Sequence, residues 1–250
     1  MRMGRLMLSI DNLFGANKTS PCVRQVYGIS GSGKTYMLNK ALKVARRMPS
    51  FGKFHRFVIF DVKHDGYEDV LLNTKKTKEY PVSDFEGVVK SLEKNRVTLI
   101  YPEIEDAPIL LEDTIKHIFD TAQRLEGFSV TFLLEESSTF IGSHPFSIPP
   151  QIKRFATQGR SLGLSLLLVN QRAINNKWVD TQSQGITIFR LAIPDAELLK
   201  KRWGLNHEQI DLKLSERKFS FAHYDLEKLR LDYYSPIKDD KKPIQGEKTS

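Results

Sequence analysis

The most chemically informative stretch of the sequence is GISGSGKT, at residues 28–35. It matches G-x-x-x-x-G-K-[ST], a loop whose glycines let successive backbone N–H groups turn toward one phosphate. In this pattern Lys34 reaches the β- and γ-phosphates and the hydroxyl of Thr35 binds Mg²⁺. An apolar run at 23–27 precedes the loop and a helix-forming run at 36–48 follows it. This strand–loop–helix context favours a site for ATP and Mg²⁺ over a plain Gly/Ser turn. The expected binding residues are Gly28, Ser30, Gly31, Ser32, Gly33, Lys34, Thr35 and Tyr36.

Two carboxylates at the end of another apolar run could complete a hydrolytic site. The run is VTFLLEE, at residues 130–136. Ligands of parallel sheets sit outside the carboxyl ends of the strands. We therefore expect Glu135 to hold Mg²⁺, although aspartate is commoner there, and Glu136 to act as general base on the attacking water. The alternative is a pair of solvated acids at the start of a loop.

A third polar group lies between residues 153 and 173. Here Arg154 and Arg160 precede an apolar run that ends in Asn170, Gln171 and Arg172. An amide at a strand tip can sense the γ-phosphate or position water, and the arginines could reach the nucleotide of a neighbouring subunit. Each arginine has an alternative interpretation as a surface charge, which is equally good for Arg154 and Arg172. The catalytic candidates are Lys34, Glu136, Gln171, Arg154 and Arg160.

Strand-length apolar runs alternate with helical runs along most of the chain. This alternation predicts an α/β fold with a mainly parallel sheet flanked by helices. A C-terminal β-hairpin follows, and Ser83 with Glu86 reads as a capping box at a helix start. The expected strands are 23–27, 56–61, 97–101, 130–134, 165–170, 186–191, 218–223 and 229–234, and the expected helices are 36–48, 83–94, 111–125, 151–162 and 195–203.

Composition is that of a single soluble domain. The chain has 250 residues, of which 40% are hydrophobic and 27% charged, and no apolar run reaches the roughly 18 residues that span a bilayer. We expect an N-terminal extension at 1–20, one ATPase domain at 21–234 and a disordered Pro/Lys-rich tail at 235–250. The single cysteine, Cys22, excludes an internal disulfide and suits a reducing compartment.

Positive charge is concentrated near the N-terminus. The net charge is +8, but residues 1–60 alone carry eleven Lys and Arg against one acidic residue. Lys40, Lys43 and Arg47 share one helical face. That face is either a solvated surface or one that meets a polyanion such as nucleic acid.

Taken together, these motifs resemble the FtsK–HerA superfamily of DNA-pumping ATPases. The resemblance rests on GISGSGKT, DVKHDGY at 61–67, LLEE at 133–136 and GRSLGLSLLLVNQR at 159–172. It implies a RecA-like (ASCE) P-loop NTPase core with an additional strand, working as a ring. Gln171 matches the family's polar sensor and Arg160 its arginine donated in trans, while Asp61 and Lys63 match the acidic and basic positions after the second strand.

The compact size is most similar to the genome-packaging ATPases of icosahedral viruses with internal membranes. That similarity implies an ATP hydrolase stimulated by double-stranded DNA, acting as a hexamer or pentamer, with a viral capsid or membrane portal component as a further partner. It implies the host cytoplasm, or the packaging vertex of a virion, as its location. The loop at Lys75–Lys78 and the basic face near Lys40–Arg47 are the candidates for gripping DNA.

Three other classes share the phosphate-binding loop. A small-molecule kinase would carry an arginine-dense lid, which the sequence lacks. An AAA+ replication initiator or helicase loader would carry a C-terminal helical domain, whereas residues 186–234 look rich in strands. A filamentous-phage assembly protein would be tethered to a membrane.

Overall fold

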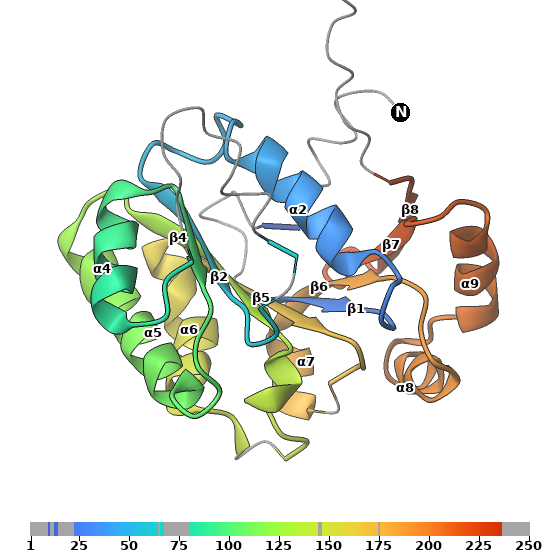
Figure 1. Cartoon of the computed structure of the whole chain (residues 1–250). Coiled ribbons are helices and arrows are strands. Elements are labelled where there is room, and N and C mark those ends of the chain that lie inside the picture. The colour runs from blue at the N-terminus through green and yellow to red at the C-terminus, as the bar shows by residue number, and fades with distance from the viewer. Residues whose placement is uncertain are drawn as a thin grey trace, which may run out of the picture.

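The computed structural model describes residues 10, 13–14, 23–64, 66–67, 81–144, 147–174 and 176–236. Its centre is an eight-stranded sheet in the order β3-β2-β4-β5-β1-β6-β7-β8 (Figure 1). The first six strands of this order run parallel, and β7 and β8 form an antiparallel hairpin at one edge. The strands are β1 (Val23–Tyr27), β2 (His55–Phe60), β3 (Val97–Ile100), β4 (Ser129–Glu135), β5 (Leu164–Asn170), β6 (Ser183–Ile188), β7 (Phe221–Asp225) and β8 (Arg230–Tyr234).

Helices cover both faces of the sheet. Figure 1 shows α2 on one face and α4, α5 and α6 on the other. The helices are α2 (Lys34–Ala45), α4 (Phe85–Lys94), α5 (Ala107–Arg124), α6 (Pro150–Gln158), α7 (Lys177–Gln182), α8 (Ile193–Trp203) and α9 (His207–Ser215), with short 3-10 turns η1 (Ser137–Thr139) and η3 (Gly159–Leu162). This arrangement confirms the predicted fold class, a mainly parallel sheet flanked by helices with a C-terminal hairpin.

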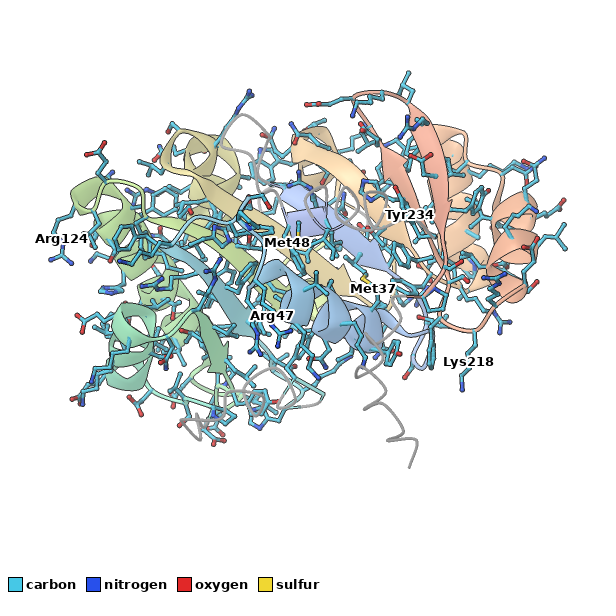
Figure 2. The ribbon with its side chains drawn as sticks, turned by 90° about the horizontal axis from the view of Figure 1, so that it is seen from above. Met37, Arg47, Met48, Arg124, Lys218 and Tyr234 are labelled. Carbon is cyan, nitrogen blue, oxygen red and sulfur yellow. The ribbon has the colours of Figure 1, made fainter. Side chains whose placement is uncertain are left out.

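Two hydrophobic cores follow from the alternation of side chains along the buried strands. Phe57 and Ile59 of β2 face α2 and pack with Leu38. Val58 and Phe60 point the other way, into the core beneath α4, α5 and α6. Figure 2 looks onto the α2 face and labels Met37 and Met48, both buried. Ile10, Leu13 and Phe14, from the predicted N-terminal extension, are buried in this same core.

The order of the strands places the predicted motifs at one edge. β5 lies between β1 and β4, which is the additional strand expected of a RecA-like core. Its register sets Asn170 beside Tyr27 and Val169 beside Glu135. The P-loop, the carboxylates after β4 and the tip of β5 therefore meet at the carboxyl edge of the sheet.

Some predicted boundaries were wrong for identifiable reasons. α4 begins at Phe85, and its cap is Asp84, whose carboxylate accepts a hydrogen bond from the Gly87 N–H at 2.6 Å, rather than Ser83. β6 begins and ends three residues before the predicted 186–191. The short helices α7 and α9 escaped prediction because each buries only one or two side chains, too few to produce a helical apolar period.

The proposed domain limits stay predictions. Most of 1–20 and of 235–250 lies outside the described residues, as do Cys22 and the basic cluster at 75–78. Within the described part of the chain, no helix is long and apolar enough to cross a membrane.

Candidate nucleotide-binding site

The loop between β1 and α2 is wrapped around its own lysine. Gly31 and Gly33 take left-handed backbone conformations, with φ of 72° and 102°, which a side chain would disfavour. The Lys34 ammonium donates to the carbonyls of Gly28 and Ile29 at 2.5 and 3.2 Å. Burial lowers the pKa of Lys34, while the charge of Glu135 opposes that shift. No side chain caps the start of α2, so its backbone N–H groups remain available to an anion.

A cavity of about 390 Å³ opens in front of this loop and gathers most of the predicted site. It receives Glu135 from β4 and Gln171 from the tip of β5. Of the predicted binding residues, Ser32 faces a neighbouring cavity and Gly28 is buried at the base of the loop. The lining residues are Ser30, Gly31, Gly33, Lys34, Thr35, Tyr36, Asp61, Lys63, Glu135, Gln171 and Phe219.

Glu135 is a buried carboxylate held by a tyrosine. It ends β4 with 6% of its surface exposed, and the Tyr67 hydroxyl donates a hydrogen bond to its Oε1. Burial is the main cause of its raised pKa, about 7. The hydrogen bond from Tyr67 partly offsets that rise, and the negative charge of Asp61 adds to it.

The oxygen atoms around this carboxylate suit Mg²⁺. Thr35 offers a hydroxyl, and Asp61 and Glu135 offer carboxylates, all lining the same cavity. Such hard oxygen donors are the ligands that Mg²⁺ prefers. A divalent cation would also relieve the repulsion between the two carboxylates that contributes to the raised pKa of Glu135.

Glu136 stands in a strained backbone conformation directly after β4. Its φ and ψ of 48° and 44° are left-handed, which is uncommon for a residue other than glycine and is typical of functional sites. Its carboxylate forms an ion pair with Lys63, which follows β2. The Lys63 backbone N–H in turn donates to the Asp61 carboxylate at 2.9 Å. The residues after β2 thus hold the predicted general base.

The tip of β5 is joined to the turn after β4. The buried Asn170 side chain accepts a hydrogen bond from the Ser138 N–H and donates one to the Ser137 hydroxyl, both at 2.7 Å. Gln171, the next residue, lines the cavity. The predicted sensor therefore lines the same cavity as Lys34 and Glu135.

The two predicted arginines lie elsewhere. Arg154 of α6 and Arg160 of η3 come before β5, toward the amino edge of the sheet. β5 is seven residues long, so its two ends are about 20 Å apart. The Arg154 guanidinium lies 4.2 Å from the ring centroid of Phe119. Neither arginine lines the cavity of its own chain, and their role in trans stays a prediction.

Two residues of the site were not predicted from the sequence: Tyr67, which holds Glu135, and Phe219, which lines the cavity. Tyr67 belongs to the DVKHDGY segment, where an aromatic beside two acidic residues was the only signal. The same segment is tied to α2, because the Asn39 side chain donates to the Gly66 carbonyl. Phe219 follows α9 and gave no sequence signal at all.

No protein-family model matches the sequence, and no curated protein sequence matches it. Solved structures do match. The genome-packaging NTPase B204 of Sulfolobus turreted icosahedral virus 2, in complex with AMPPCP, has a TM-score of 0.64 at 16% identity over 89% of this chain and 100% of that one. B204 of Sulfolobus turreted icosahedral virus, a DNA-packaging ATPase, has a TM-score of 0.64 at 15% identity, covering 87% and 99%.

A secretion ATPase matches as well. The cytoplasmic domain of the type VII secretion ATPase EccC of Thermomonospora curvata has a TM-score of 0.51 at 9% identity, over 89% of this chain and 24% of that one. The predicted resemblance to FtsK–HerA-like packaging ATPases is thus confirmed at the level of the fold: this chain has the P-loop NTPase fold of the viral genome-packaging NTPases.

Proposed function

We propose that this chain is an ATP-hydrolysing motor that moves double-stranded DNA, most similar in role to a viral genome-packaging ATPase. The observation that supports it best is the single cavity that joins Lys34 of the P-loop, Glu135 at the end of β4 and Gln171 at the tip of β5. B204, a neighbour in fold, has been solved in complex with AMPPCP, an analogue of ATP, which supports a nucleotide as the ligand of this chain.

Hydrolysis in this cavity is mainly a matter of position and charge. Lys34 and the loop N–H groups bind the phosphates, and Glu136 orients the attacking water and accepts its proton. Mg²⁺, held by Thr35 and Glu135, would neutralise charge on the β- and γ-phosphates. Gln171 contacts the γ-phosphate side of the cavity. Paired glutamates beside the phosphates favour water as the acceptor over a second small substrate, which argues against a kinase.

The cavity lacks one component that fast phosphoryl transfer uses. Among the described side chains that line it, the cations are Lys34 and Lys63, and none is an arginine. An arginine supplied in trans is worth roughly 10³–10⁵ in rate in GTPases. Arg160 lies at the opposite edge of the sheet from its own P-loop, which supports a role in the site of a neighbouring subunit. We therefore propose a ring, a hexamer or pentamer, in which each subunit completes the next.

Positive charge on and after α2 supports DNA as the partner. Lys40 and Lys43 of α2 are partly exposed, and Arg47, which follows the helix and is labelled in Figure 2, is exposed. Contacts from such residues to phosphates would be indifferent to sequence and strongly dependent on salt. The same proposal includes a capsid or membrane portal component as a further partner. It places the chain in the host cytoplasm or at the packaging vertex of a virion.

The decisive experiment measures ATP turnover per subunit against protein concentration, with and without duplex DNA. Turnover should rise as the chain assembles and rise again with DNA, releasing phosphate without a phosphorylated product. In the assembled state Arg160→Ala should lower turnover by roughly 10³-fold or more. Arg124→Ala, an exposed arginine at the same edge (Figure 2), is the matched control and should leave it unchanged.

Mixing two inactive variants tests the subunit boundary directly. Glu136→Gln and Arg160→Ala subunits, each idle alone, should recover activity when mixed, because some boundaries then pair an intact base with an intact arginine. If diluted monomers hydrolysed ATP at the full rate, and DNA did not change that rate, the proposed motor function would be wrong.

A further inference from the structure

A second cavity lies beside the P-loop, on the side away from the carboxylates. Its volume is about 470 Å³. It shares Ser30, Gly31 and Phe219 with the first cavity, so the two adjoin along the loop. Its other lining residues are Ile29, Ser32, Arg190, Leu214, Ser215, Lys218 and Ser220.

The topology of the sheet dictates which part of a nucleotide would enter this cavity. The carboxylate Glu135 and the amide Gln171 lie on the β5 and β4 side of β1, and the γ-phosphate must lie near them. Because the loop holds the middle of the triphosphate, the sugar and base must extend toward the other side of β1. That side is β6, where Arg190 follows the strand and residues 214–220 lead into β7.

One aromatic residue stands between the two cavities. The Phe219 ring packs on Tyr36, with ring centroids 4.9 Å apart and an interplanar angle of 32°. It also closes tightly on the loop, because a Cβ added at Gly33 would lie 2.5 Å from its Cδ1. Lys218 places its ammonium group 4.9 Å from the centroid of the same ring.

The backbone at Phe219 is unusual for such a residue. Its φ of 63° is in the left-handed region, which bulky side chains rarely adopt. The ring is only partly buried, so packing in a core does not account for the conformation. Strain of this kind is retained at sites that bind ligands.

We propose that Phe219, supported by Tyr36, is the platform on which the nucleotide base stacks, with the second cavity as the site for base and sugar. The flexible Lys218 side chain leaves the ring when the base arrives, and Arg190 and Lys218 supply donors to acceptor atoms of the base and sugar. This inference rests on the proposed function only in requiring that the P-loop binds a nucleoside triphosphate.

The test compares ATP with inorganic triphosphate, which has the phosphates but no base. Dissociation constants with Mg²⁺ are measured by calorimetry for the native chain and for Phe219→Ala, Phe219→Leu and Phe219→Trp. Phe219→Ala should weaken ATP binding on the order of tenfold. It should leave the affinity for inorganic triphosphate within about twofold, which also shows that the loop is intact. Leucine fills the space without a flat ring and should behave like alanine, whereas tryptophan should bind ATP as the native chain does.

Phe54→Ala is the matched control, because Phe54 is an exposed aromatic remote from the loop. The proposed platform would be refuted if Phe219→Ala lost equal affinity for ATP and for inorganic triphosphate. It would also be refuted if Phe219→Leu or Phe219→Ala bound ATP as tightly as the native chain. A native chain that binds both ligands equally would also overturn it and leave the P-loop assignment standing. A native chain that binds neither would instead refute the proposed function.

Discussion

The buried polar groups at the two edges of the sheet differ in charge and in hydrogen bonding. At the amino edge, the His55 ring is hydrogen-bonded through both nitrogens, to Ser129 at 2.8 Å and Thr131 at 3.0 Å, and Thr131 donates to the Phe14 carbonyl. At the carboxyl edge, Glu135 is a buried carboxylate near a second one.

Backbone strain follows the same division. Four described residues other than glycine have a positive φ: His64, Glu136, Phe219 and Leu229. The first three lie at the carboxyl edge, and only Leu229, in the β7–β8 turn, lies at the amino edge. Folding alone favours neutral, paired groups in relaxed conformations, as around His55. We infer that the carboxyl edge is arranged for a ligand whose charge completes it.

The largest expected effect is a loss of ATP hydrolysis at the carboxyl edge without a loss of ATP binding. Glu136→Gln removes the proton acceptor without removing a phosphate or metal ligand, so ATP turnover should fall by roughly 10²–10⁴-fold while the affinity for ATP persists. Turnover and calorimetric binding measure the two quantities. Glu126→Gln, an exposed glutamate before β4, is the control. Turnover within tenfold of native would remove Glu136 as the base.

The next effect tests whether Glu135 costs stability when no ligand is bound. Its pKa is raised from 4.5 to about 7, so the folded state holds this proton more tightly than the unfolded chain. Stability should therefore fall as the pH rises from about 4.5 to 7. Without nucleotide or Mg²⁺, Glu135→Gln should be more stable than the native chain at pH 8 by on the order of 1–3 kcal/mol, and the gap should close toward pH 5. Urea unfolding at both pH values measures the difference in the free energy of unfolding. If the stabilities of the two proteins changed in parallel with pH, the prediction would be wrong.

The amino edge should respond to pH in the opposite direction. Burial, aided by the charges of Arg96 and Arg56, lowers the pKa of His55 from 6.5 to about 3. The unfolded chain then takes up a proton below pH 6.5 that the folded state refuses, so stability is lost as the pH falls. Between pH 7 and pH 5 the native chain should lose about 1–2 kcal/mol more than His55→Gln. His223, whose pKa is also lowered, titrates in both proteins and cancels in the difference. Equal losses would mean that His55 is not the buried neutral group described.

The smallest effect concerns the positioning of Glu135. Tyr67→Phe removes one hydrogen bond to the carboxylate, so the Mg²⁺ concentration needed for half-maximal ATP binding should rise by about fivefold. Binding without Mg²⁺ should not change, which separates this role from a general packing defect. Tyr233→Phe, at an exposed tyrosine on β8, is the control. An unchanged Mg²⁺ requirement would show that Tyr67 only fills space.

The site could be predicted where its chemistry is contiguous in the chain. In three places a buried strand leads directly into polar residues: GISGSGKT, the paired glutamates, and Asn170 with Gln171. At each place neighbouring residues encode both the polar group and its position at the end of a strand. Tyr67 could not be assigned in this way, because its partner Glu135 is 68 residues away and no local period marks the segment between. Phe219 was missed for the same reason, since Gly33, the residue it contacts, lies near the other end of the sequence.

By itself, the sequence determined the fold class, the phosphate loop and the two glutamates, because apolar periodicity and short motifs are local properties of the chain. Only the tertiary structure decided that Lys63 holds Glu136, that Tyr67 holds Glu135, and that the candidate arginines lie at the far edge from their own P-loop. These relations depend on the order and direction of the strands. Strand order is set by the pairing of segments that are distant in the sequence, so no local stretch of residues encodes it.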